Sequence, residues 1–402
     1  MTDARLGRSF VRTAPSPDLP PPLRVGGPLG WARENLFGGP LSTVLTLASV
    51  AFLAWVTPDL VRWLFLDAVW TAPDGEACRA PGAGACWAYV RAKISFFAYG
   101  SYPRDMTWRV DLTLVLGAAL AVWLLWPGAR RKALGLFLFL VVYPIVAFHL
   151  LYGMGARERA GLAWLAEAVG SQALADVAAN ALPIVTTNLW GGIFVSLLVA
   201  TVGIVVSLPF GVLLALGRQS QAPALRFVCV ALIEIVRGVP LITVLFMANT
   251  MLPLFVPEEW SPDRLLRPLI GVALFASVYM AEVVRGGLQS VPKGQVEGAM
   301  ALGLSWRHRM RLIVLPQALT TVIPGIVNSF IALFKDTTLV AIVGVFDFLR
   351  AVDTQRLDPV WAGPTISATG YVFAAAFYFV FCFAMSRYSL MMERRLAHGR
   401  RR

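Results

Sequence analysis

The sequence predicts an all-α integral membrane protein with about eight transmembrane helices. Of its 402 residues, 57% are hydrophobic and only 14% are charged, and the mean hydropathy is +0.68. Ordinary soluble domains do not have such a composition. Helices that cross a hydrocarbon core about 30 Å thick need roughly 20 apolar residues, and suitable windows lie at 41–57, 110–126, 134–152, 190–216, 227–252, 267–284, 316–345 and 370–390.

Topology accounts for the net charge of +12. If both termini are inside, the inside segments hold most of the Lys and Arg residues, which is the bias typical of cytoplasmic loops. We therefore expect cytoplasmic termini and no nucleic-acid partner. The first forty residues are rich in Arg and Pro and do not resemble a cleavable signal peptide. Segment 1–40 is expected to be a disordered cytoplasmic tail, and 391–402 a basic one.

The distribution of polar residues divides the chain near residue 190. Before it, 41–152 is expected to form a three-helix extension with an exterior loop at 58–109. A connecting segment at 153–189 is expected to form an amphipathic surface helix, with Leu162, Leu165, Val169, Leu174 and Val177 as its apolar residues. After it, 190–390 is expected to form a five-helix core that carries the transport path.

Two of the four cysteines, Cys78 and Cys86, lie in the exterior loop. A disulfide persists on the oxidising side of a membrane, so we expect these two to be bridged, with two free thiols as the alternative. Cys229 and Cys382 fall in apolar segments and are expected to be inert. No metal site is predicted, since the histidines are few and widely separated.

The cytoplasmic segment 285–316 is the most informative stretch. Its sequence VEGAMALGL at 296–304 is rich in small residues and is followed by a basic run through Arg307, His308, Arg309 and Arg311. Small side chains let another surface approach a helix closely, and cations suit a helix C-terminus. We expect a short helix that is held by a partner. The alternative is a solvated basic loop.

This segment resembles the EAA loop of ABC importer permeases, which forms a coupling helix in a cleft of the ATPase subunit. The resemblance rests on EGA at 297–299, Gly303 and IVLP at 313–316, and it implies coupling roles for Glu297, Gly298, Ala299, Gly303 and Arg307. The family usually has Ala where this chain has Gly298. Glycine is a poorer helix former by about 1 kcal/mol, but it keeps the surface small.

The resemblance covers about residues 188–390. Over this range the chain resembles the polar amino acid branch of these permeases. Its further motifs are NLWGG at 188–192, EIVRGVP at 234–240, YMAEVVRGG at 279–287, PKGQ at 292–295 and FKDTTL at 334–339. The three-helix extension resembles that of general L-amino-acid transport system permeases. The implied core is the five-helix type I importer (MetI-like) fold.

The resemblance also implies the activity and the partners. A permease of this branch moves L-amino acids, polar or of broad range, from periplasm to cytoplasm by alternating access in a bacterial inner membrane. It works with an ATP-binding cassette ATPase dimer, a periplasmic amino-acid-binding protein and a second, paralogous permease that makes a heterodimer. This chain has no GxxxxGK[ST] motif, so it is expected to be no enzyme and to hold no cofactor, ATP and Mg being bound by the ATPase.

A candidate substrate site lies around Lys335. One helix over 313–345 would be about 50 Å long, too long for the membrane, so we expect a break at Lys335-Asp336-Thr337-Thr338 and a half-helix after it. The positive N-terminus of that half-helix and Lys335 would face a substrate carboxylate. Asp336 or Glu282 would bind the ammonium, and the expected site comprises Lys335, Asp336, Thr337, Thr338, Asn328 and Glu282.

Other interpretations of these charges stay open. Lys335 and Asp336 would neutralise each other, or pair with Glu234, Arg237 or Asn328, if their role is helix packing. Glu234, Arg237 and Pro240 are expected to be gate or packing elements. Two rival functions are an ion-coupled secondary carrier of amino acids and a non-conducting partner subunit of the same ABC complex.

Overall fold

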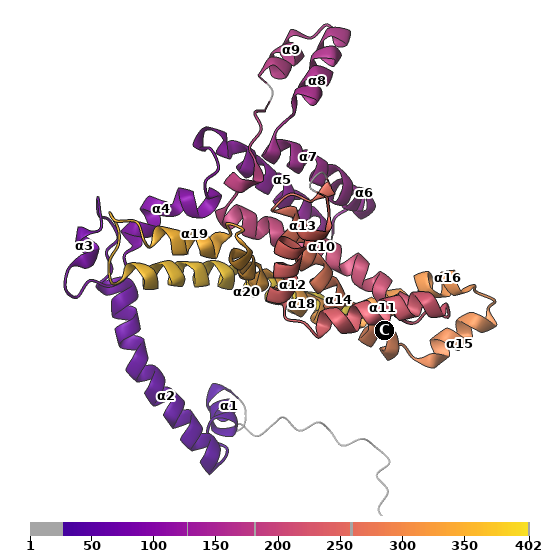
Figure 1. Cartoon of the computed structure of the whole chain (residues 1–402). Coiled ribbons are helices and arrows are strands. Elements are labelled where there is room, and N and C mark those ends of the chain that lie inside the picture. The colour runs from indigo at the N-terminus through magenta and orange to yellow at the C-terminus, as the bar shows by residue number, and fades with distance from the viewer. Residues whose placement is uncertain (1–26, 127, 181, 258–259, 401–402) are drawn as a thin grey trace, which may run out of the picture. The chain divides into compact units, whose positions relative to one another are not determined.

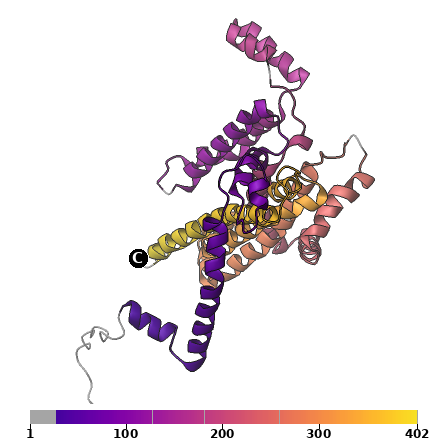
Figure 2. The ribbon, with the colours of Figure 1, turned by 90° about the vertical axis from the view of Figure 1, so that its left-hand side faces the viewer.

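The computed structural model describes residues 27–126, 128–180, 182–257 and 260–400 (Figure 1). These residues are helical, apart from connecting loops and two isolated bridges. The predicted all-α class is confirmed. The chain divides into two compact units, residues 1–68 and 69–402. Figure 2 shows the same ribbon from a second direction.

The first unit contains α1 (Pro28–Asn35) and α2 (Pro40–Val61), which continues as a π-helical turn over Arg62–Leu66. The expectation of a disordered tail is wrong for α1, and its earlier part lies outside the described residues. The first membrane helix does not end at Pro58, which lies inside α2. A hydrophobic environment favours continued helix because unpaired backbone groups are costly there. No side chain of α2 is buried, as suits a lipid-facing helix.

The predicted number of membrane helices is confirmed. Among the described residues, seven helices are long and apolar enough to cross a membrane. An eighth span is α11 (Pro223–Arg237) followed by α12 (Leu241–Phe246) and its continuation to Phe255, with a bend of 109° between them. The bend falls at Gly238-Val239-Pro240 because proline lacks the N–H and disfavours helix in the preceding residue.

Two long helices form the centre of the second unit, α10 (Gly192–Arg218) and α14 (Leu266–Ser290). Small residues let them approach closely: a Cβ added at Gly211 would lie 2.7 Å from Met280 Cβ. The other core helices are α17 (Leu315–Thr321), α18 (Ile323–Asp336) and α20 (Ile366–Arg400). Half of the apolar window of α14 is buried inside the protein. The buried share is only 17% for the span Arg104–Leu125 and 11% for the span Lys132–Tyr152.

The predicted break at residues 335–338 coincides with the end of the α-helix at Asp336, but a break that was not predicted comes before it. This additional break lies at Val322, between α17 and α18, where Pro324 occupies the first turn of α18. After Asp336 the chain tightens into a 3₁₀ helix over Thr337–Val343, and Gly344 ends it with φ 83°. Lys335 and Asp336 therefore lie at a C-terminal end of α18. The segment after the break is a 3₁₀ helix of seven residues rather than the half-helix that was expected.

The connecting segment also differs from the prediction. It forms two helices, α8 (Ala156–Val169) and α9 (Gln172–Ala179), rather than one. Gly170 has φ 65° and turns the chain, and the Ser171 hydroxyl accepts a hydrogen bond from the Leu174 N–H at 3.4 Å. The result is an α8–α9 hairpin that stands apart from the other helices of its unit in both views (Figures 1 and 2).

The exterior loop of the extension is folded into the core. It contains α3 (Glu76–Arg79) and α4 (Trp87–Tyr99), with a disulfide between Cys78 and Cys86 whose Cα atoms are 5.7 Å apart. Side chains of these helices share one hydrophobic cluster with α19 (Phe348–Gln355) and α20, including Tyr89, Phe97, Phe348, Trp361 and Ile366. The part of the extension that belongs to the second unit is thus packed against the core.

Candidate coupling surface and membrane site

The predicted coupling helix is α15 (Lys293–Ala301). Its C-terminus is closed by Gly303, which has φ 70°, and by a hydrogen bond from the Leu304 N–H to the Ala299 carbonyl at 3.1 Å. This bond pattern is the Schellman motif, in which glycine supplies the left-handed residue. Gly303 is therefore required by the backbone. Sequence reasoning had singled it out only for its small surface.

The turn after α15 carries exposed apolar side chains. Met300, Leu302 and Trp306 are 51%, 79% and 53% exposed. Of the predicted coupling residues, Glu297, Gly298, Gly303 and Arg307 are exposed, whereas Ala299 is buried at 2% and supports the helix from inside. A Cβ added at Gly298 or Gly303 would meet no atom within 4 Å. These residues form an open apolar tip suited to a partner cleft.

A cluster of five charged side chains joins α10, α11 and α14. Glu282 accepts bonds from Arg218 at 3.0 Å and Arg285 at 2.9 Å, and it lies 3.5 Å from Arg237. Arg218 also contacts Glu234 at 3.0 Å. Glu282 is the least exposed member, at 16%. Charges in membrane helices are stabilised by such pairing, so the cluster ties three helices together.

These contacts refine the sequence-based expectations. Glu282 and Arg285, three residues apart, pair on one face of α14. Glu234 pairs with Arg218 rather than with Arg237. Both oxygens of Glu282 already have cationic partners, so binding a substrate ammonium there would require the cluster to open. Arg218 was missed, although a cation in the last turn of a long apolar helix was a usable signal.

The candidate substrate residues lie along α18 and the turn after it. Asn328 and Lys335, seven residues apart, are both exposed, and Asp336 is partly exposed. Within the described chain, Lys335 forms no ion pair with Asp336, Glu234 or another acid. The Thr338 hydroxyl donates to the Lys335 carbonyl at 2.9 Å. Thr337 is fully buried, and its hydroxyl donates to the Phe334 carbonyl at 2.8 Å. This bond stabilises the backbone where α18 passes into the 3₁₀ helix.

The two buried acidic or basic residues among the described side chains were not predicted. Asp347 is fully buried and caps α19, accepting from the Arg350 N–H at 2.9 Å and the Leu349 N–H at 3.1 Å. Burial raises its pKa to about 7, against the effect of these hydrogen bonds. Arg109 is 2% exposed and donates to the Pro183 carbonyl at 2.9 Å. An N-cap signal marked Asp347, whereas nothing in the sequence marked Arg109 as buried.

Together these features define a class of protein. Within the second unit, a bundle of membrane helices carries an exposed helical tip at one end, α15 with α16 (Trp306–Arg309), and a packed cap of α3, α4 and α19 at the other (Figure 1). No cluster of three or more His, Cys, Asp or Glu residues suited to a metal occurs in the described ranges. Such a bundle is the membrane component of a transport system.

Comparisons identify the family. Residues 207–398 match the family described as binding-protein-dependent transport system inner membrane component. The chain is 43% identical to the inner membrane amino-acid ABC transporter permease protein YhdY of Escherichia coli strain K12, over 92% of this chain and 93% of that protein. It is 42% identical to the glutamate/glutamine/aspartate/asparagine transport system permease protein BztC of Rhodobacter capsulatus, over 98% and 99%.

The chain therefore belongs to the amino-acid ABC transporter permeases. A solved amino acid ABC transporter "with histidines" is 27% identical over 51% of this chain and 92% of that one, with a TM-score of 0.45. As a permease, the chain is a multi-pass inner-membrane subunit and not an enzyme, and ATP is hydrolysed by a partner ATPase. The ion-coupled carrier is set aside, because this family is driven by ATP.

Proposed function

We propose that this permease carries L-amino acids along the face of α18 that bears Asn328, Lys335 and Asp336. The observation that supports the proposal is the exposure of Asn328 and Lys335 on a helix that spans the membrane. An intramembrane cation in lipid is costly, and such residues normally face another helix bundle or a water-filled path. The exposed face of α18 therefore belongs to the path or to a second permease.

The chemistry of this face suits an α-amino acid. Lys335 supplies a cation for the substrate carboxylate, and the Asp336 carboxylate supplies an anion for the ammonium. The Thr338 hydroxyl donates to the backbone and keeps its lone pairs as acceptors. We assign Glu282 to the charge cluster rather than to the substrate, and Thr337 to support of the backbone. Glu234, Arg237 and Pro240 act as gate or packing elements.

The partners follow from the two exposed surfaces. The tip formed by Met300, Leu302 and Trp306 docks in the cleft of the ATPase dimer, and the α18 face meets a paralogous permease, which makes a heterodimer. With α15 in the cytoplasm, both termini are cytoplasmic and the α3–α4–α19 cap faces the periplasmic binding protein. The relatives include permeases named for glutamate, glutamine, aspartate and asparagine, so we propose acidic and amide amino acids as the substrates.

The decisive experiment is uptake by the reconstituted complex with Lys335→Ala, and with Lys335→Arg as the charge-conserving control. We expect uptake to fall at least tenfold with Ala and to recover in part with Arg, while subunit association stays intact. Competition by a panel of L-amino acids identifies the substrates. Full uptake with Lys335→Ala would mean that this chain is the non-conducting subunit of the pair.

A further inference from the structure

The α8–α9 hairpin is too small to be stable by itself. Its helices have 14 and 8 residues, and isolated helices shorter than about 12–15 residues are marginal in water. Among its described side chains, only Ala166 and Ala178 are buried. The hairpin therefore needs a second surface to cover it.

One face of the hairpin is apolar. Leu162, Leu165 and Val169 are spaced by three and four residues on α8, and Leu174 and Val177 by three on α9, so each set lies on one side of its helix. Leu165, Val169 and Val177 are 42%, 63% and 58% exposed. With the two helices antiparallel and in contact through Ala166 and Ala178, both sets point to the same side.

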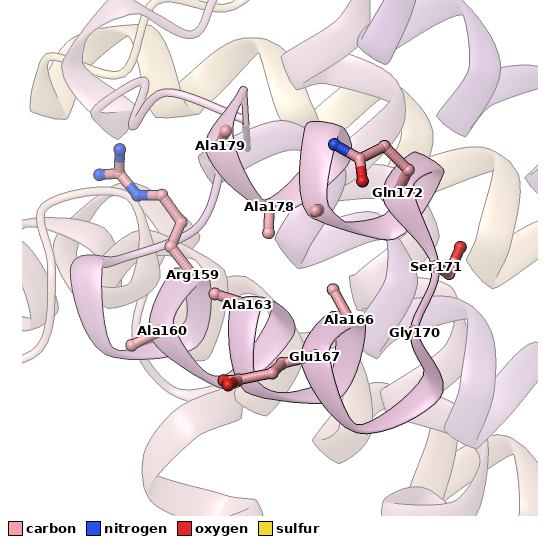
Figure 3. Close-up of a pocket in the computed structure, with 11 residues that line it drawn as sticks. Arg159, Ala160, Ala163, Ala166, Glu167, Gly170, Ser171, Gln172, Ala178 and Ala179 are labelled. Carbon is pink, nitrogen blue, oxygen red and sulfur yellow. The ribbon is translucent and has the colours of Figure 1, made fainter.

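The opposite face is lined by small and polar side chains. Figure 3 shows Ala163, Ala166 and Ala178 between the two helices, with Arg159, Glu167 and Gln172 around them. Ala160 and Ala179 complete this shallow groove. The hairpin is thus amphipathic as a whole, although α8 by itself has only a weak apolar stripe.

The base of the hairpin is held at the membrane boundary. The Met154 N–H donates to the Leu182 carbonyl at 3.0 Å, and the Val185 N–H to the Tyr152 carbonyl at 2.7 Å. Tyr152 ends one membrane span, and Gly192 begins the next. At 1.5 Å per residue, α8 reaches only about 20 Å from this base. The whole length of α8 can therefore lie on the lipid surface next to these two spans.

We propose that the α8–α9 hairpin lies on the lipid surface at the side of the membrane opposite to α15, with its apolar face toward the acyl chains. The charged side chains Glu158, Arg159, Glu167 and Asp176 have mixed sign, so burial of apolar surface drives the contact and uncharged phosphatidylcholine suffices. In this placement the groove between the two helices is turned to the water.

Site-specific fluorescence in the assembled transporter tests this placement. Cys229 and Cys382 are replaced by Ser, the Cys78–Cys86 disulfide is kept, and an environment-sensitive label is attached after Val169→Cys or Val177→Cys. Matched controls are Glu167→Cys and Gln172→Cys on the groove face. In phosphatidylcholine nanodiscs, a lipid nitroxide at a shallow acyl position should quench the labels at 169 and 177 several-fold more than those at 167 and 172. Aqueous iodide should show the reverse.

Two results would overturn the proposal. One is equal iodide quenching on both faces with no lipid quenching. The other is protection of 169 and 177 only after the binding protein is added, which would make the hairpin a protein-docking element. A second test uses a variant without a label, so that it stays valid if labelling disturbs the fold. Leu165→Lys with Val177→Lys should speed protease cleavage of the hairpin in nanodiscs several-fold, and an unchanged rate would count against lipid contact.

Discussion

Arg218 at the end of α10 and Glu282 in α14 form an ion pair of 3.0 Å, and Glu282 also has Arg237 and Arg285 as partners. Within this cluster Glu282 is the shared anion, since the three arginines otherwise have only Glu234 to balance them. Pairs of this kind are expensive to break from one side, because the partner charges remain without compensation.

We therefore predict that Glu282→Gln destabilises the permease by about 2–3 kcal/mol. This is below the usual cost of about 3–5 kcal/mol for a buried pair, because the Glu282 side chain keeps 16% exposure. Glu234→Gln is the matched control, since Glu234 is 53% exposed and contacts one arginine, and it should cost about 1 kcal/mol or less. Thermal unfolding in nanodiscs measures both. Equal effects would show that Glu282 has no special place in the cluster.

Asp347 predicts a pH dependence of stability. Its folded-state pKa is raised to about 7 by burial, above the ordinary value near 4. The stabilisation of the folded state by protonated Asp347 is therefore fully present below about pH 4 and is lost as the pH rises through about 7. Melting temperatures measured from pH 5 to pH 8 should fall for the natural chain and stay flatter for Asp347→Asn, which still caps α19. Parallel curves would contradict the assignment.

The sequence was sufficient where the physical signal was local. Apolar length predicted the spans, small residues before a basic run predicted α15, and two cysteines in an exterior loop predicted the contact that the structure shows as a disulfide. Within the 313–345 segment the end of the α-helix at Asp336 was predicted, whereas the break at Val322 was missed, although Pro324 in the first turn of α18 was a usable signal.

Contacts between distant segments were beyond the sequence. Nothing local indicates that Arg79 donates to the carbonyls of Pro359, Val360 and Ala362 at 2.8–3.0 Å. Such pairings are set by tertiary packing, which also brings Arg218 to Glu282. The predicted substrate roles of Lys335, Asp336 and Asn328 stay predictions, since they depend on a second permease and on substrate.

The αL conformation of Gly303 separates two explanations of the coupling motif. Gly303→Ala forces an L-residue to φ 70°, which costs about 1 kcal/mol or more. Gly303→Asn adds a larger side chain but tolerates this conformation. If the backbone is what matters, Ala should lower ATPase co-purification and uptake more than Asn does.

Gly303→Arg adds bulk and charge, and it should release the ATPase altogether while the permease stays in the membrane. Gly298→Ala is the control for the helix itself. It lies in open space and should leave uptake unchanged. Full ATPase association with Gly303→Arg would refute the assignment of α15 as the coupling helix.

Phe97 tests whether the extension is a separable layer. The sequence predicted that 41–152 forms an extension and that 190–390 alone carries the transport path. The structure buries Phe97 of α4 completely, with ring centroids 6.3 Å from Phe348 and 5.8 Å from Phe373. Truncating a buried phenylalanine costs about 3–5 kcal/mol. Deleting the extension should therefore harm the core helices themselves.

We expect Phe97→Ala to lower the melting temperature and the yield of the assembled transporter markedly, and to leave its relative preference among amino acids unchanged. Phe137→Ala is the matched control, because Phe137 is 55% exposed on α6 (Lys132–Phe137) and its loss removes little packing. Both variants are measured in the same lipid, with uptake normalised to the amount of complex. An altered amino-acid spectrum at unchanged stability would show that α4 acts on the path directly and does not only support α19 and α20.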